Sequence, residues 1–453
     1  MNGLLFKRKI YKRMLEWKTG SAGSTALLIK GARRVGKSTI AETFARQEYK
    51  SYAMIDFSIA DTAVKELFSR LTDLNAFFIG LQSLTGVRLE ERQSVVIFDE
   101  VQLFPAARQA IKHLVKDGRY DYIETGSLLS IKKNVKGIVI PSEETRIEMH
   151  PMDYEEFLWA IGKEATYDGI RSAYERQSAM GDAVNRALLY DFRLWMLVGG
   201  MPQAVSAYIE GKDFRAIDDV KRGILELYAD DLMKIDATGR AARIFRAIPG
   251  ELTHGSRHYM VGRVIKNATA ARLSGVLADI DDSMTVSYAY QADDPAAGMA
   301  LHTDYSMFKI FLADTGLFVT LAFWDRDYAE NDLYRRLLSD KLHANLGYVY
   351  ENAVAQLLRS TGHRLFFHSW RETTTNNNGK TTEHLYEIDF LVGRGSKICP
   401  IEVKSSGYKS HRSLDVFMRK YSRRIDEGYL VYTRDLRREE RLTLLPIYMA
   451  AML

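Results

Sequence analysis

The chain has 453 residues, 46% of them hydrophobic, and this length favours about three separate cores over one. Its 63 Lys and Arg residues and 58 Asp and Glu residues give a formal net charge of +5, which permits an acidic partner without requiring one. Cys399 is the single cysteine, which excludes an internal disulfide and a cysteine-based zinc site and fits a reducing, cytoplasmic setting.

The N-terminal segment MNGLLFKRKIYKRMLEWK mixes charged and apolar residues. It lacks the apolar run and the cleavage site of a secretory signal, so it predicts an amphipathic opening helix, with a membrane or nucleic-acid anchor as the alternative. Its basic residues are expected to be solvated: Lys7, Arg8, Lys9, Lys12 and Arg13. No apolar stretch in the chain is long enough to predict a membrane-spanning helix.

The stretch ALLIKGARRVGKSTIAETF places a glycine-rich loop between an apolar strand, 26–29, and a helix, 39–44. The spacing from Gly31 to Gly36, Lys37 and Ser38 is that of a P-loop. In that geometry the loop amides face phosphates, Lys37 reaches the outer phosphates and the Ser38 hydroxyl coordinates Mg²⁺. The predicted nucleotide-binding residues are Gly31, Ala32, Arg33, Arg34, Val35, Gly36, Lys37, Ser38 and Thr39, with the two arginines assigned to solvent or interdomain contacts.

A second buried strand, 95–98, ends at two acidic residues. Asp99 is expected to hold Mg²⁺ through water, and Glu100 to orient or deprotonate the attacking water. Solvated acids at a strand end are the alternative, but the P-loop upstream favours the nucleotide site. A third strand ends at Thr125 and Ser127, either of which would sense the terminal phosphate or simply cap a helix.

Further strands near residues 51 and 145 complete an α/β doubly wound parallel sheet within residues 1–158. The motifs GARRVGKST, VVIFDEVQ, ETGSLL and HPMDYEEFL resemble the AAA-type P-loop ATPase module of a large bacterial and archaeal family, whose members add a C-terminal domain of unknown function. The similarity continues through VGGMPQAV, LYADDLMKI and MFKIFLADTGLF. It implies ATP and Mg²⁺ as cofactors and ATP hydrolysis as the activity.

Residues 159–235 are predicted to be helical, with a break at Gly199, Gly200 and Pro202 that forces a turn. The resemblance implies a helical lid with this turn as its hinge, and a plain helix corner is the alternative. Residues 236–340 combine helices with a two-stranded hairpin, the plan of a winged helix. Such a region binds a duplex or packs between domains.

Residues 341–453 carry a second constellation. A helix with Glu351 precedes a strand with Asp389, and a further strand places Glu402 and Lys404 on one face. Carboxylates of this kind hold a hard divalent ion, and the lysine positions water or stabilises charge on phosphate. The arrangement resembles the PD-(D/E)XK nuclease fold, which implies a C-terminal α+β nuclease-like domain. A cross-strand charge pair on a solvated face is the alternative.

Basic residues alternate with aromatic ones in GYKSHRSLDVFMRKYSRR, a pattern suited to a phosphate backbone or to a solvated helix face. The sequence therefore predicts an ATP-hydrolysing protein that engages DNA. The predicted catalytic residues are Lys37, Glu100 and Lys404, and the predicted metal ligands are Ser38, Asp99, Glu351, Asp389 and Glu402. The alternative is a nucleotide-controlled switch whose C-terminal domain is catalytically inactive and binds a protein partner.

Overall fold

The computed structural model describes residues 4–126, 142–253, 258–296, 298–325, 334, 337–339, 347–375, 381–406 and 408–453. The chain forms two compact units, one of residues 1–150 with 282–284 and one of residues 151–281 with 285–453. Within these described ranges, no helix has the length and apolar character needed to cross a membrane.

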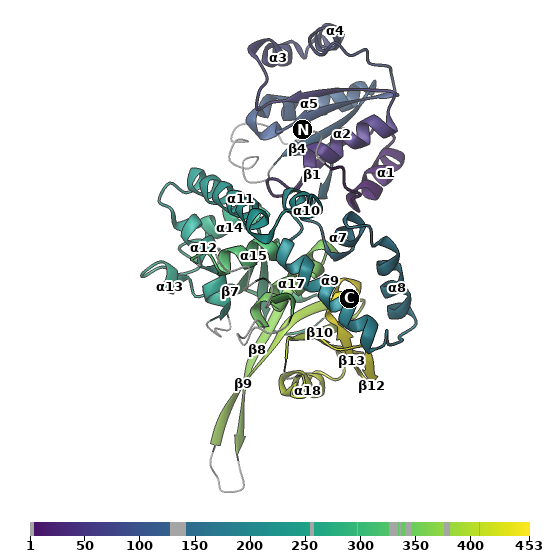
Figure 1. The fold of residues 1–453 in the computed structure, drawn as a ribbon. Helices are drawn as coiled ribbons and strands as arrows, with labels where there is room; N and C mark the ends of the chain where they lie inside the picture. Colours follow the sequence, from purple (N-terminus) through teal and green to yellow (C-terminus); the bar gives the residue numbers. More distant parts are fainter. Residues whose placement is uncertain are drawn as a thin grey trace. The chain divides into compact units, whose positions relative to one another are not determined.

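The first unit alternates strands and helices (Figure 1). In chain order its elements are α1 (Ile10–Ser21), β1 (Ala26–Lys30), α2 (Lys37–Glu48), β2 (Ser51–Asp56), α3 (Thr62–Leu67), η1 (Phe68–Arg70), α4 (Leu74–Thr85), β3 (Ser94–Asp99), η2 (Val101–Leu103), α5 (Pro105–Asp117), β4 (Asp121–Gly126) and β5 (Glu144–Glu148).

The five strands of this unit form one parallel sheet in the order β2-β3-β4-β1-β5, which confirms the predicted α/β sheet. In this register Ile29 of β1 lies opposite Thr125 of β4, and Phe98 of β3 lies opposite Glu124. Because parallel strands end at the same edge, the loop after β1, Asp99 at the end of β3 and Thr125 near the end of β4 meet there.

Helices cover both faces of this sheet. Buried residues of α4 and α5 form one apolar core with Leu28, Val96 and Phe98. Helix α2 contacts β2, β3 and β4, and its buried Phe44 lies outside that core. In the central strands β1, β3 and β4, the residues that alternate with the core set are also buried, because these strands are covered on both sides.

Glu124 lies in the interior of this unit, on the opposite strand face from Thr125. It is fully buried, and neither of its carboxyl oxygens receives a hydrogen bond. The neighbouring Glu144 is held by Arg108, whose Nε and Nη2 each donate over 2.9 Å. Burial, followed by the charge of Glu144, raises the pKa of Glu124 well above its ordinary value of 4.5, so the native state retains this proton.

We expect Glu124→Gln to stabilise the protein at pH 8 but not at pH 5. The pKa of Glu124 is higher in the native protein than in the unfolded protein. Its contribution to the free energy of unfolding is therefore fully present below the pKa of the unfolded protein. As pH rises from that value toward the native pKa, the contribution falls by about 1.4 kcal/mol per pH unit. A neutral glutamine avoids that loss. Denaturant unfolding of the full chain from pH 5 to pH 8 measures the difference, which should grow with pH.

Glu144→Gln is the matched contrast, because it removes the partner of Arg108 and should destabilise the protein at both pH values. If Glu124→Gln gives the same change in unfolding free energy at pH 5 and pH 8, the inference that Glu124 is protonated in the native state is wrong.

The second unit begins with helices and ends with a sheet. Its helices are α7 (Tyr154–Ala160), α8 (Glu164–Glu175), α9 (Asp182–Val198), α10 (Pro202–Ile209), α11 (Phe214–Ile235), α12 (Arg240–Thr253), α13 (Val261–Val264), α14 (Ser274–Asp282), α15 (Thr315–Ala322), α17 (Gly347–Ser360) and α18 (Arg412–Lys420), with short turns η3 (Met299–His302) and η4 (Ile447–Met452). Its strands are β6 (Val286–Ala292), β7 (Thr303–Leu312), β8 (Leu365–Thr375), β9 (Thr381–Arg394), β10 (Lys397–Lys404), β11 (Gly428–Tyr432), β12 (Arg437–Glu439) and β13 (Leu442–Pro446).

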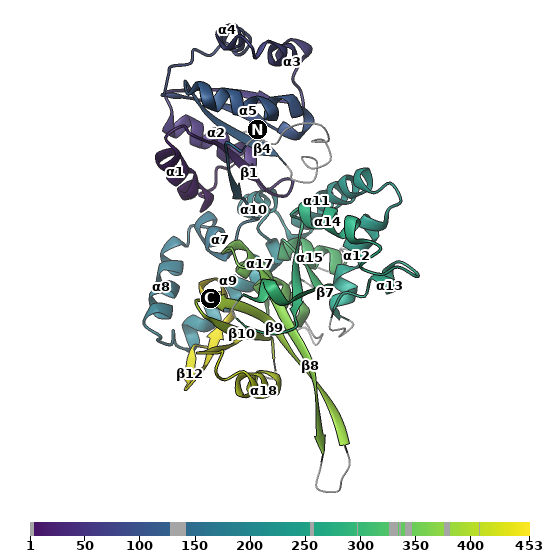
Figure 2. The same cartoon turned by 180° about the vertical axis from the view of Figure 1, so that it is seen from behind.

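These strands form one mixed sheet in the order β12-β13-β11-β10-β9-β8-β6-β7. The hairpin β6–β7 was expected to be the wing of a winged helix, yet β6 pairs in parallel with β8, placing Ala289 opposite Leu365. The hairpin therefore extends the C-terminal sheet across residue 340, the expected domain boundary. Figure 2 shows that β8 and β9 also run on beyond the other strands as a two-stranded ribbon.

The glycine break between α9 and α10 is a close-packed corner. Gly200 N–H donates to the Asp314 carboxylate over 2.5 Å, and a Cβ on Gly200 would lie 2.0 Å from the carbonyl oxygen of Met152. A Cβ on Gly316 would lie 2.5 Å from Gly199 Cα. The motifs VGGMP and LADTG thus meet at a point where backbones approach too closely for side chains.

Candidate nucleotide and cation sites

The P-loop connects β1 to the first turn of α2. Gly36 has φ +98°, which favours glycine, and a Cβ on Gly31 would lie 2.4 Å from the carbonyl oxygen of Met149. The Lys37 ammonium donates to the carbonyl oxygens of Gly31 and Ala32 over 3.0 and 2.9 Å, so it lies across its own loop. Burial lowers the pKa of Lys37, and the charges of Glu100 and Asp99 oppose that shift.

Asp99 is the centre of a hydrogen-bond network at the sheet edge. It is 4% exposed, and its Oδ1 accepts from the Ser38 hydroxyl over 2.8 Å and also from the Thr125 hydroxyl. Thr125 Oγ1 in turn accepts from the Glu100 N–H over 3.3 Å. The structure thus brings the predicted P-loop hydroxyl and the predicted acid together, and Thr125 of β4 also contacts this acid.

Glu100 has a left-handed backbone with φ +53°, and its carboxylate accepts from the side-chain amide of Gln102. Arg33, Arg34 and Thr39 are exposed, and Arg34 is also left-handed, with φ +70°. Ala32 and Val35 are buried beneath the loop. Ser127, the other predicted phosphate sensor, lies outside the described residues.

Arg8 is a P-loop neighbour that the sequence analysis missed. It was expected to be solvated, but it is 6% exposed and donates to the carbonyl oxygens of Val35 over 2.9 Å and His150 over 2.6 Å. That expectation is therefore wrong for Arg8. Its guanidinium joins the P-loop to the segment after β5, because its planar, two-pronged donor reaches both carbonyl groups.

The residues around the P-loop fit ATP and Mg²⁺. The glycine cradle and the N-terminus of α2 present backbone N–H groups to an anion. Ser38 and Asp99 present a hydroxyl and a carboxylate oxygen 2.8 Å apart, and such hard oxygen donors suit Mg²⁺.

The second constellation lies on β9, β10 and α17. Lys404 Nζ lies 2.8 Å from Glu402 Oε1, and Asp389 Oδ2 accepts from the Val403 N–H over 2.8 Å. Glu402 is 5% exposed, and its second oxygen, Oε2, has no hydrogen-bond partner. A buried carboxylate oxygen without a donor, beside a second carboxylate, fits a hard divalent cation.

Glu351 does not join these two carboxylates. Its carboxylate is 2.8 Å from the ammonium of Lys309 on β7, and Lys309 also lies 2.6 Å from Glu387 on β9. Among the residues the structure describes, no three His, Cys, Asp or Glu side chains converge as a metal cluster. A cation here would therefore rest on Asp389, Glu402 and water.

The acidic groups of this cluster resist ionisation. Burial raises the pKa of Glu402 to about 7, with a further contribution from Asp389 and an opposing one from Lys404. Burial likewise raises the pKa of Glu351 to about 7, opposed by Lys309. Burial tends to lower the pKa of Lys309, but Glu351 and Glu387 outweigh it and raise that pKa. These carboxyl groups therefore retain their protons to higher pH than exposed carboxyl groups do.

The basic segment after β10 lies close enough to this cluster for His411 to lower the pKa of Glu402. The guanidinium of Arg412 lies 5.7 Å from the Tyr386 ring centre, and the ammonium of Lys420 lies 5.5 Å from that of Trp370. Arg424 is instead engaged by Asp294. The exposed cations of the segment are Lys409, Arg412, Arg419, Lys420 and Arg423.

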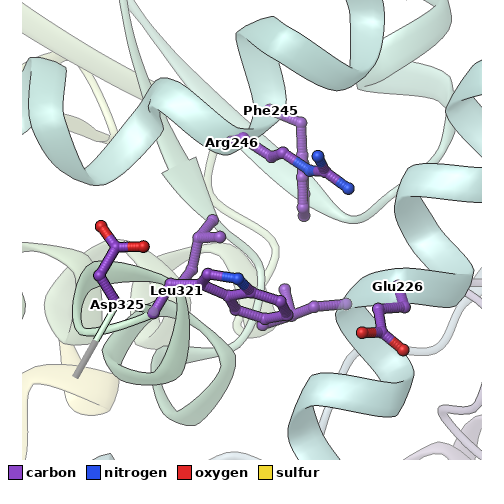
Figure 3. A pocket seen from close by; sticks show the side chains of 7 residues that line it. Glu226, Phe245, Arg246, Leu321 and Asp325 are labelled. Carbon is purple, nitrogen blue, oxygen red and sulfur yellow. The ribbon is translucent and has the colours of Figure 1, made fainter. Parts of the chain in front are cut away.

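A separate cavity of about 330 Å³ lies among α11, α12 and the end of α15 (Figure 3). Its apolar wall is Leu225, Phe245, Leu321 and Trp324, and its charged side chains are Glu226, Arg246 and Asp325. The Trp324 ring is covered by the Arg222 guanidinium at 4.4 Å. None of the residues that line this cavity was predicted to bind a ligand.

Three segments of the chain match known families. Residues 23–158 match the AAA domain family, residues 189–328 match a domain of unknown function (DUF8612), and residues 346–449 match a second domain of unknown function (DUF4143). No curated protein matches the chain. With the parallel sheet and the P-loop geometry, the first match makes residues 23–158 an AAA-type P-loop ATPase domain, for which ATP binding is expected.

Solved structures show distant likeness. The Walker-type ATPase PABY2304 of Pyrococcus abyssi is 17% identical, with a TM-score of 0.43 over 70% of this chain and 96% of that chain. The RuvB Holliday junction branch migration motor of Thermotoga maritima is 12% identical, with a TM-score of 0.27 over 60% and 82%. Cdc6p of Pyrobaculum aerophilum is 11% identical, with a TM-score of 0.25 over 76% and 97%.

We expect Arg8→Met to loosen the P-loop. Loss of the guanidinium leaves the carbonyl oxygens of Val35 and His150 without this donor, which should cost about 1–3 kcal/mol of stability. ATP affinity should fall with it, because the loop is then less ordered before binding. Thermal unfolding and a titration with a fluorescent ATP analogue measure the two effects. Lys12→Met, an exposed change on α1, is the control and should alter neither.

Proposed function

We propose that the protein binds Mg·ATP at the P-loop and hydrolyses ATP. The single observation that supports this most strongly is the Asp99 carboxylate, which accepts from both Ser38 and Thr125 at the carboxyl edge of the sheet. When bound, Mg²⁺ would be held by Ser38 and Asp99 and would neutralise charge on the phosphates. Lys37 supplies a positive charge beside the same phosphates.

Glu100 is the proposed general base or water-orienting residue. It follows the cation-holding Asp99 directly, and its left-handed backbone separates its carboxylate from the strand. The Gln102 amide donates to the Glu100 carboxylate, and the Glu100 N–H donates to the Thr125 hydroxyl oxygen. These two hydrogen bonds fix the position of Glu100. An oriented carboxylate of this kind accepts a hydrogen bond from water and aims it at the terminal phosphorus.

We further propose that the second unit is nuclease-like and engages nucleic acid, and that ATP turnover is coupled to that engagement. Asp389 and Glu402 would hold a divalent cation, and Lys404 would stabilise charge developing on a phosphodiester. The exposed cations between Lys409 and Arg423 would contact the phosphate backbone.

A nucleotide-controlled switch is the second candidate function. It is favoured by the ion pair between Lys404 and Glu402, which occupies both the lysine and one of the carboxylates. In that case the C-terminal sheet would serve as a protein-binding module without chemistry.

Lys37→Ala is expected to abolish ATP binding, whereas Glu100→Gln should retain ATP binding and lower turnover by about 10²-fold or more. The two variants separate phosphate binding from water activation, because Lys37 lies across the P-loop whereas Glu100 follows the strand that ends at Asp99. Calorimetry with Mg·ATP and a phosphate-release assay measure them. Tight ATP binding by Lys37→Ala would reject the P-loop assignment, and unchanged turnover by Glu100→Gln would reject its catalytic role.

Plasmid nicking with Mg²⁺ or Mn²⁺ tests the nuclease proposal. We expect the wild-type protein to nick and Lys404→Ala to be at least about tenfold slower, because the variant loses charge stabilisation at the phosphate. Lys397→Ala on the same strand is the control and should nick normally, since Lys397 pairs with Asp426 away from the cluster. Equal cleavage by Lys404→Ala, or no cleavage by any protein, favours the switch.

A further inference from the structure

Lys309 lies on β7, far before Asp389, Glu402 and Lys404 in the sequence, and its side chain contacts carboxylates near these three residues. Its side chain is nearly buried, and its ammonium lies 2.8 Å from Glu351 and 2.6 Å from Glu387. The same ammonium lies 5.5 Å from the centre of the Phe367 ring on β8. The ammonium of Lys309 is therefore held by carboxylates from α17 and β9, near an aromatic ring of β8.

The cluster has more carboxyl groups than ammonium groups among the residues that the structure describes. Within the described ranges, the ammonium of Lys309 contacts Glu351 and Glu387, and the ammonium of Lys404 contacts Glu402, while Asp389 lies near Glu402. His411 Nδ1 lies 2.9 Å from a carboxylate oxygen of Asp415. A divalent ion would bind where a buried carboxylate oxygen remains uncommitted, which is Oε2 of Glu402.

We propose that Lys309 is a positioning residue of the cation site, an inference that rests on the cation site proposed above. By neutralising Glu351 and Glu387, Lys309 restricts the divalent ion to Asp389 and the uncommitted Oε2 of Glu402. It also limits the negative charge that the ion meets, and so keeps the affinity for the ion moderate. The β6–β7 hairpin is thereby part of the site.

The measurement is Mn²⁺ affinity of the nucleotide-free, full-length protein, read from the electron paramagnetic resonance signal of free Mn²⁺. All proteins carry Asp99→Asn, which removes the acid of the P-loop site. Lys309→Met should bind Mn²⁺ about tenfold more tightly, because removing one positive charge beside two carboxylates leaves more negative charge to attract the ion. Lys309→Arg keeps the charge and should stay within about twofold of the parent.

Glu387→Gln tests the positioning role of Lys309 by changing one of its carboxylate partners. It removes one of the two charges that Lys309 neutralises, so more of the ammonium charge acts on the ion, and Mn²⁺ affinity should fall. The double variant Lys309→Met with Glu387→Gln should return toward the parent affinity. A merely structural lysine would instead give weaker or unchanged binding in Lys309→Met and no recovery in the double variant.

Three outcomes are distinct. If the parent binds Mn²⁺ but Lys309→Met does not tighten binding, the role of Lys309 is overturned and the cation site stands. If the parent binds no Mn²⁺, the cation site is overturned and the role of Lys309 with it. If a thermal melt shows that Lys309→Met does not fold, Glu387→Gln decides, and an affinity equal to that of the parent overturns the inference.

Discussion

A single carboxylate, that of Asp99, ties three strands of the first unit together at their carboxyl ends. It accepts from Ser38 after β1 and from Thr125 on β4, while it ends β3 itself. These bonds depend on the parallel register, because only parallel neighbours bring their ends to one edge. The apolar residues of the sheet therefore fix the distance between a hydroxyl and an acid, and the nucleotide chemistry follows from that distance.

The second unit is built on a mixed sheet whose strands come from both sides of residue 340 in the sequence. Its cluster of acids is compensated by lysines on two distant strands, β7 and β10. Removing carboxylates from water is unfavourable unless each finds a donor or a cation, so the position of each lysine affects which acids are left for a ligand. The tight corner formed by Gly199, Gly200, Asp314 and Gly316 lies directly after β7 and joins that strand to the helices.

The local motifs were the part of the fold and of the sites that sequence could predict. The P-loop, Asp99 and Glu100 are each defined within a few residues by spacing and by the strand before them, and the parallel sheet follows from alternating strands and helices. Arg8, Lys309 and Glu387 were missed because their partners lie far away in the chain: Arg8 meets His150, and Lys309 meets Glu351. Solvated and buried basic residues look alike in sequence when the compensating acid or carbonyl is distant. For the same reason the hairpin β6–β7 looked like a wing, since nothing local shows that β6 pairs with β8.

The parallel pairing of β6 with β8 affects any attempt to isolate the C-terminal part of the second unit. The segment that matches a domain of unknown function, 346–449, starts after β7. A fragment cut to that segment would leave β8 as an unpaired sheet edge, with Phe366 and Phe367 near the bare backbone. Poor solubility of such a piece would report a missing pair of strands and would say nothing about the chemistry of the intact protein.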